Sequence, residues 1–135
     1  MDLEKAMLAS AAGLRAQSVR MRVISENIAN QASVASEPGA DPYRRKIITF
    51  QTEPDRATGV ELVKVSGVDL DQKEFGKKYD PGNPAADKSG YIKTSNVNGM
   101  IELMDMRQAQ RTYQSNLNAL EASRRMATMT LELLR

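Results

Sequence analysis

The sequence predicts an elongated α+β fold, in which long N- and C-terminal helices pair as a coiled coil with a small β-containing insert between them. Two observations carry this prediction. All eight methionines lie in residues 1–30 or 98–135, whereas all five prolines and six of the eight glycines lie between these segments. Because proline and glycine interrupt helices, the ends are expected to be helical and the middle is not. Apolar residues in the last segment also recur at alternating spacings of three and four, which is typical of a coiled coil.

The N-terminal segment, residues 1–30, is predicted to be an axial helix that is apolar on more than one face. One heptad column contains Met7, Leu14, Met21 and Ile28, and a second column lies round the side of the helix. Several alanines and a glycine in its first half leave room for another backbone to approach closely. The simplest interpretation pairs this helix with the C-terminal one inside the chain, and neighbouring subunits would cover the apolar surface that is left over.

The middle segment, residues 31–97, is predicted to hold two strands, at 43–51 and 60–66, which are rich in β-branched and aromatic residues and bounded by proline or glycine. These strands are expected to be antiparallel. A turn cluster at 80–84 and a short extended piece at 90–92 lead toward the last helix. The hydrophobic content of the insert is too low for a large independent core.

The C-terminal segment, residues 98–135, carries the clearest pattern. Steps of three and four visit an apolar stripe with two polar interruptions, made of Leu103, Met106, Gln110, Tyr113, Leu117, Leu120, Arg124, Ala127, Leu131 and Leu134. Asn96 or Asn98 is expected to cap the start of the helix, and Glu102 and Asp105 are expected near the positive end of the helix dipole. Leu117 and Leu120 are predicted core positions, and Ser123 is predicted to lie off the seam. At 1.5 Å per residue this helix measures about 55 Å, whereas a compact globule of this size has a radius of gyration of about 14 Å, so an elongated molecule is expected.

The composition argues against catalysis. The chain has 135 residues, the length of one domain, with a formal net charge of +2 and neither histidine nor cysteine. Thiol chemistry, histidine acid–base catalysis and zinc fingers are therefore excluded. The stretch from Asp69 to Asp80 superficially resembles a calcium loop, but Lys73 occupies a ligand position and Glu74 the place of the turn glycine. No catalytic residue, metal site or cofactor is expected, and an enzyme is not predicted.

No targeting or membrane signal is evident in the sequence. The longest charge-free stretch near the start, residues 6–14, is short and follows Asp2 and Glu4 instead of a basic cluster, which does not fit a secretory signal peptide. No run is long and apolar enough to span a membrane. A protein of this kind that leaves the cytoplasm would need an export route that accepts an uncleaved chain.

A nucleic-acid interface is the main alternative to a purely structural role. Arg44, Arg45 and Lys46 lie beside Tyr43 and close to Phe50, and the isoelectric point is about 9.0. However, the insert carries as many acidic as basic residues, whereas a surface that follows phosphates usually has an excess of positive charge on one face. The triplet is therefore expected to be a solvated strand edge or to form salt bridges with an acidic neighbouring subunit.

Four motifs occur in order along almost the whole chain. They are SENIAN at residues 25–30, PYRRK at 42–46, DPGNPAAD at 80–87 followed by GYI at 90–92, and NVN at 96–98 leading into ELMDM at 102–106 and RTYQSN at 111–116. Any one of these motifs would be a weak signal, since the first could be an ordinary helix end. Together they resemble the bacterial flagellar basal-body rod proteins, and the length also fits.

The resemblance implies a structural axial subunit of the proximal rod, which transmits motor torque across the periplasm to the hook. Its partners would be copies of itself, other rod proteins, and ring and export-gate components at the rod base, without nucleic acid and without direct membrane insertion. Members of this family are exported through the flagellar type III apparatus without signal-peptide cleavage and polymerise through paired terminal helices. Another axial or secretion-apparatus subunit, or a small basic nucleic-acid-binding adaptor, are the alternatives.

The resemblance and the heptad pattern together assign structural or subunit-interface roles to a set of positions. Asn27 and Asn30 would fix the end of the first helix, with plain capping as the alternative, and Tyr91 and the turn at 80–87 would shape the insert. The full set is Leu14, Met21, Asn27, Ile28, Asn30, Tyr43, Arg44, Arg45, Asp80, Pro81, Asn83, Pro84, Tyr91, Asn96, Asn98, Met104, Met106, Tyr113, Leu117, Leu120 and Leu131.

Overall fold

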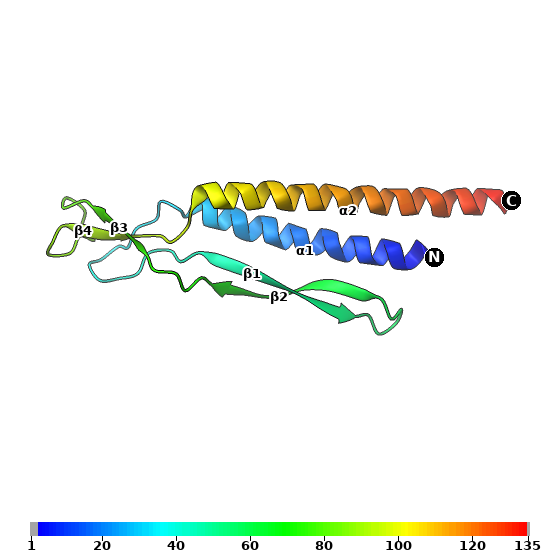
Figure 1. The fold of residues 1–135 in the computed structure, drawn as a ribbon, viewed down its shortest axis with the longest axis horizontal. Coiled ribbons are helices and arrows are strands. Elements are labelled where there is room, and N and C mark those ends of the chain that lie inside the picture. The colour runs from blue at the N-terminus through cyan, green and yellow to red at the C-terminus, as the bar shows by residue number, and fades with distance from the viewer. Residues whose placement is uncertain (1–2, 135) are drawn as a thin grey trace. The chain divides into compact units, whose positions relative to one another are not determined.

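The computed structural model describes residues 3–134, so residues 1, 2 and 135 of the expected terminal segments lie outside it. The chain forms two long helices separated by four strands (Figure 1). In chain order the elements are α1 (Leu3–Ala29), β1 (Lys46–Pro54), β2 (Glu61–Leu70), β3 (Gly76–Tyr79), β4 (Tyr91–Thr94) and α2 (Gly99–Leu133). The predicted α+β class, with long terminal helices and a small β-containing insert, is confirmed.

The strands form two separate two-stranded sheets, β1 with β2 and β3 with β4. The first pair is antiparallel, as predicted, because the Asp71 N–H donates to the Arg45 carbonyl at one end and the Asp55 N–H donates to the Val60 carbonyl at the other. The second pair is antiparallel from Gly76 opposite Thr94 to Tyr79 opposite Tyr91. The sequence did not reveal β3, because its two lysines and exposed face show no apolar alternation.

The chain divides into two compact units, each assembled from distant segments. Unit 1 contains Met1–Met21, Ile48–Gly67 and Arg107–Arg135, and unit 2 contains Arg22–Ile47 and Val68–Met106. Both helices contribute to both units.

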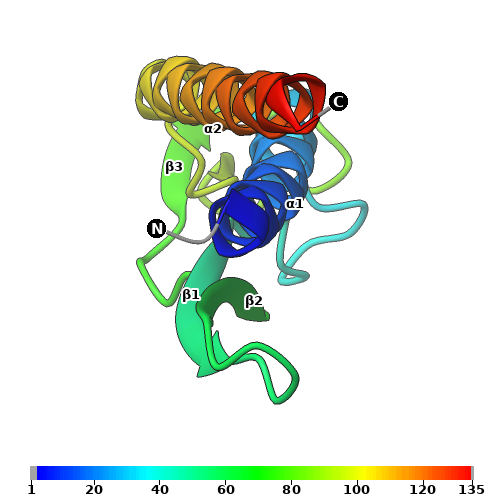
Figure 2. The same cartoon turned by 90° about the vertical axis from the view of Figure 1, so that its right-hand side faces the viewer.

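In unit 1, α1 lies between α2 on one side and the β1–β2 ribbon on the other (Figures 1 and 2). The helices pack closely at Gly13, where an added Cβ would lie 2.5 Å from Nδ2 of Asn116. Ala16, one turn further along α1, is buried. Small residues on α1 therefore permit the close approach that the sequence indicated.

The packed face of α2 is displaced from the predicted seam by one column. Ala109 is fully buried and Ser123 is only 6% exposed, whereas Leu131 is 68% exposed. The prediction that Ser123 lies off the seam was therefore wrong. The physical reason is steric, because close contact with the glycine and alanine face of α1 suits short side chains, and the large ones are displaced to the flanks. The heptad column that contains Tyr113 and Leu120 is half-buried, and it belongs both to the predicted seam and to the packed face that the structure shows.

Unit 2 has a small core of Ala35, Ala85 and Ile92, against which Ala86 packs. The loop before β4 returns on itself at Gly90, whose φ of 81° lies in the left-handed region that favours glycine. A side chain there would also meet the ring of Tyr79. The core is small, and polar contacts supply much of the remaining organisation of this unit.

Candidate functional site

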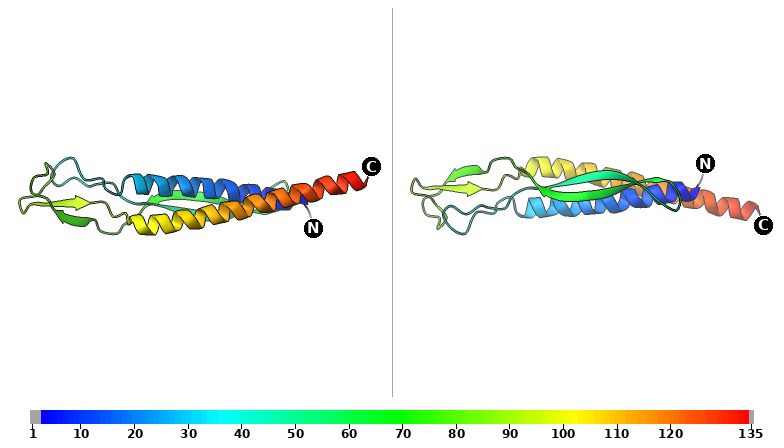
Figure 3. Two further views of the ribbon diagram at one scale, coloured as in Figure 1. Left: turned by 90° about the horizontal axis from the view of Figure 1, so that it is seen from above. Right: turned by 90° about the horizontal axis from the view of Figure 1, so that it is seen from below.

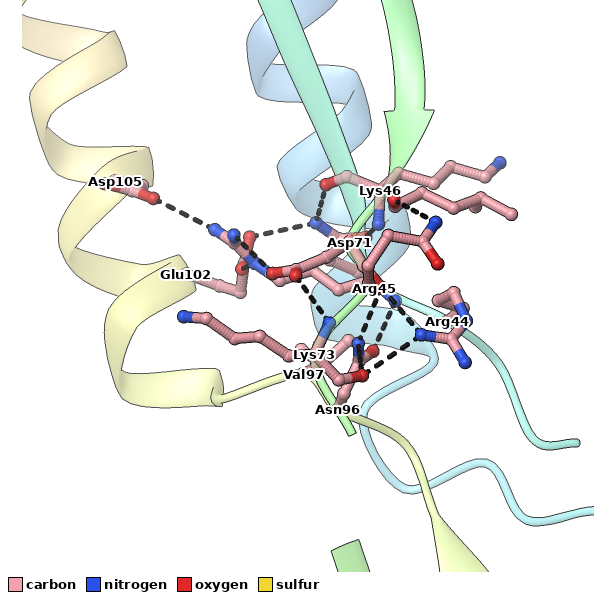
Figure 4. Close-up of polar contacts among 12 residues, drawn as sticks. Arg44, Arg45, Lys46, Asp71, Lys73, Asn96, Val97, Glu102 and Asp105 are labelled. Atoms are coloured by element: carbon pink, nitrogen blue, oxygen red, sulfur yellow. Dashed lines mark hydrogen bonds and ion pairs between the residues drawn. The ribbon is translucent and has the colours of Figure 1, made fainter. Parts of the chain in front are cut away.

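A buried polar cluster in unit 2 joins four segments of the chain: the end of α1, the start of β1, the end of β2 and the start of α2 (Figure 4). Its members are Glu26, Asn27, Tyr43, Arg44, Arg45, Lys46, Asp71, Lys73, Asn96, Glu102 and Asp105. Its two central side chains are almost inaccessible, since Glu102 is 0% exposed and Asn27 is 1% exposed. We call this group the clamp.

Asn27 uses its whole hydrogen-bonding capacity inside the clamp. Its Nδ2 donates to the Lys46 carbonyl (2.8 Å) and to Oε2 of Glu102 (3.1 Å). Its Oδ1 accepts from the Lys46 N–H (2.9 Å) and from the Tyr43 hydroxyl (2.9 Å). An amide offers two donors and two acceptor positions, so no capacity is left for a helix cap. Asn27 therefore ties α1 to the start of β1 instead of ending its own helix.

Arg45 holds three carboxylates around its guanidinium group. Nε donates to Oε1 of Glu102 (2.5 Å), and the two terminal nitrogens lie 3.4 Å from Oδ2 of Asp71 and 3.5 Å from Oδ2 of Asp105. Burial lowers the pKa of Arg45, but the hydrogen bonds and charges of Glu102 and Asp71 outweigh burial and raise the pKa above its usual value. Glu102 is thus fully buried and forms both an ion pair and a hydrogen bond with Arg45.

Asp71 and Asn96 bind the end of β2 into the clamp. The pKa of Asp71 is lowered, first by the Lys73 backbone N–H, which donates to its carboxylate, and then by Arg45. Asn96 accepts the Arg45 backbone N–H at Oδ1 (2.6 Å), and its Nδ2 donates to the carbonyls of Asp71 and Lys73, each at 3.1 Å. The cap of α2 is instead Asn98, whose Oδ1 accepts backbone N–H groups of the first turn.

The basic triplet is used within the unit and is not the solvated strand edge that the sequence suggested. Beside Arg45, the Lys46 ammonium pairs with Glu26 at 2.8 Å, which lowers the pKa of Glu26 and raises that of Lys46. Arg44 donates to two β2-end carbonyls and its guanidinium lies 4.1 Å from the centre of the Phe75 ring. Burial raises the pKa of Tyr43.

The predicted turn residues make local contacts. Asn83 accepts the Ala85 N–H (3.0 Å), and the Asp80 N–H donates to the Gly90 carbonyl (2.9 Å). Tyr91 stacks edge-on against Tyr79, with ring centres 5.2 Å apart.

The other predicted positions fall into three groups by their surroundings. Asn30 closes α1 through an Nδ2 bond to the Glu26 carbonyl (2.8 Å). Pro81, Pro84, Met104 and Leu131 are exposed. The half-buried helix positions, which keep part of their surface accessible, are Leu14, Met21, Ile28, Met106, Tyr113, Leu117 and Leu120.

Sequence reasoning placed Asn27, Tyr43, Arg45 and Asn96 among the important residues but missed Glu102, the partner that Asn27 and Arg45 share. Glu102 was interpreted only as a charge near the positive end of a helix. Its position one heptad before Ala109 is the signal that could have revealed its burial, since the two share a column.

Chemically, the clamp is a satisfied network suited to holding segments together. Among residues 3–134, no group of three acidic side chains is arranged to hold a metal ion. Within the same range, no helix combines the length and the apolar character needed to cross a membrane.

Comparison with known proteins gives a consistent result. The family described as "Flagellar basal body rod FlgEFG protein C-terminal" matches residues 88–133. "Flagellar basal-body rod protein FlgC" of Agrobacterium fabrum is 48% identical over 133 residues, covering 98% of this chain and 96% of the relative. The protein of the same name from Salmonella typhimurium is 41% identical over 122 residues, covering 89% of each chain. That of Bacillus subtilis is 32% identical over 139 residues, covering 92% of this chain and 93% of its own.

Proposed function

Because this chain belongs to the FlgC family of flagellar basal-body rod proteins and is a structural rod subunit of the flagellar basal body, we propose that its terminal helices polymerise it into the proximal rod. The rod would cross the periplasm and transmit motor torque to the hook. The proposed partners are copies of this chain, other rod proteins, and ring and export-gate components at the rod base. Export would proceed through the flagellar type III apparatus without cleavage of a signal peptide.

The observation that carries this proposal is the apolar surface at the start of α2. Met100, Ile101, Leu103 and Met104 are all substantially exposed, with Met104 at 65%. Contiguous apolar surface of this kind marks an interaction site in a soluble protein. These side chains lie within two residues of the clamp residue Glu102, so they are presented on a helix start whose position is fixed by buried polar bonds.

The role proposed is structural, without turnover, nucleic acid or direct membrane insertion. The basic triplet supports this view because its three cations engage carboxylates, carbonyls or an aromatic face within unit 2. A nucleic-acid adaptor would instead bind with an affinity that falls steeply with salt. Retention of the unmodified chain on DNA or RNA at physiological salt would therefore favour the adaptor over the rod subunit.

A complementation experiment tests the rod assignment. Basal bodies are purified from a strain that lacks the native gene and carries this chain, and density for the chain is sought by electron microscopy. Met104→Lys should abolish swimming and rods while the purified subunit keeps the circular dichroism of the parent. Gln108→Lys, on an exposed polar position of the same helix, is the matched control and should swim. Basal bodies that are complete without the chain would refute the proposal.

A further inference from the structure

The end of α2 extends beyond the start of α1 in unit 1. The two helices run in opposite directions and meet at Gly13 and Asn116, so the same register places Leu3 opposite Met126. The residues of α2 that follow Met126 therefore pass the first described residue of α1 (Figure 3). We call residues 128–134 the overhang.

The overhang is apolar and open to solvent on all sides. Every residue from 128 to 134 is exposed, and the large side chains among them are Met129, Leu131, Leu133 and Leu134. Leu133 is 88% exposed. A helix end with this much exposed apolar surface is expected to be buried in its functional state.

An apolar groove lies elsewhere in unit 1, between α1 and β2. Its volume is about 330 Å³, and its lining is largely aliphatic, from Ala12, Ala16, Val19, Leu62, Val63 and Val65. The alanines of α1 create the hollow, because short side chains stand where longer ones would fill the space. Two basic residues, Arg15 and Lys64, also line the groove.

Charge at the groove complements charge at the overhang. The only charged side chain between Met126 and Leu134 is Glu132. Lys64 pairs with Glu53, whereas Arg15 has no ion-pair partner within residues 3–134. Arg15 is thus a cation available to an incoming acidic helix end.

We propose that the overhang of one copy of this chain docks in the α1–β2 groove of a second copy, with Glu132 facing Arg15. The overhang and the groove belong to the same unit, yet the overhang is exposed and does not fill the groove of its own chain. The proposed contact therefore joins two molecules. Such an interface is heterologous: in a bound pair one copy keeps a free groove and the other keeps a free overhang, so the contact can continue from copy to copy round a ring or along a helix. This inference rests on the proposed function as a rod subunit.

Cross-linking between two tagged copies tests the contact. The chain contains no cysteine, so each introduced thiol is unique. Val19→Cys and Leu133→Cys are co-expressed as separate, differently tagged chains, and purified basal bodies are oxidised. The mixed disulfide should form, and mass spectrometry of the bridged peptides identifies both ends. The matched control replaces Leu133→Cys with Ser115→Cys, which lies 18 residues earlier, five helical turns away on the same exposed face. Its yield should be at least tenfold lower.

Charge reversal tests whether Glu132 and Arg15 face each other across the contact, because a variant that only damaged folding would not be rescued by a second change in the other chain. Arg15→Glu should lower the cross-link yield severalfold, and adding Glu132→Arg to the other chain should restore it. Basal bodies that contain the chain but give no mixed cross-link above the control would overturn the docking inference and leave the rod function intact. A cross-link from residue 133 to a different rod protein would overturn the choice of a second copy. Absence of the chain from basal bodies would instead overturn the proposed function itself.

Discussion

Replacing Glu102 with glutamine should destabilise the chain by about 2 kcal/mol. The substitution preserves shape and one acceptor for Asn27, but it removes the charge that receives the Arg45 Nε–H and presents an amide donor there instead. A hydrogen bond to a charged group contributes about 1.5–3 kcal/mol, and removing one partner of a buried ion pair costs about 3–5 kcal/mol. The expected loss lies toward the lower end of these two ranges, because Arg45 keeps Asp71 and Asp105 as partners and is partly exposed.

Urea denaturation followed by circular dichroism measures this effect. With a slope of about 2 kcal/mol per molar urea, the midpoint should fall by about 1 M. Asp105→Asn is the matched control, because Asp105 also faces Arg45 but lies at 3.5 Å with 39% of its side chain exposed, and it should cost less than about 1 kcal/mol. A Glu102→Gln midpoint equal to that of the parent, or an equally large loss for Asp105→Asn, would refute the reasoning about the clamp.

Three further predictions concern packing and pH. Gly13→Leu should cost about 1–3 kcal/mol by overpacking, with partial recovery when Asn116→Ala makes room, as read from urea midpoints. Ser123→Asp places an unpaired charge at a buried position, so its midpoint should fall at least as far as that of Leu117→Asp, and a milder effect would restore the original seam. Asp71 has a lowered pKa in the folded chain, so its stabilisation is present above its unfolded value of about 3.8 and is lost as pH falls through the folded pKa; midpoints at pH 7 and pH 3 should therefore differ less in Asp71→Asn than in the parent.

The sequence predicted the elements of this fold better than it predicted their contacts. The terminal helices and the first hairpin follow from spacing and from proline and glycine, which act locally. The register of the helices does not, because small residues such as Gly13 and Ser123 occupy packed positions, and a pattern of large apolar residues does not indicate their burial. The leucines that define the visible stripe are partly exposed.

The clamp was hidden for a different reason. Asn27 and Glu102 are 75 residues apart, and each has a sufficient local explanation, as a helix cap and as a charge near a helix dipole. Only the folded chain brings them together. Arg45 was singled out as part of a basic triplet, and its three acidic partners come from two segments that follow it in the sequence.

This separation along the chain sets the order in which the clamp can form. Asn27 and Arg45 precede both Asn96 and Glu102, so a chain emerging N-terminus first exposes its polar groups long before their partners arrive. Until those partners arrive, burying the Asn27 amide and the Arg45 guanidinium would remove them from water without replacing all of their hydrogen bonds. The early segments therefore gain no stability from packing together. The long sequence separation of its members thus postpones completion of the clamp until the last helix has been made, and the earlier segments stay free of these tertiary bonds until then.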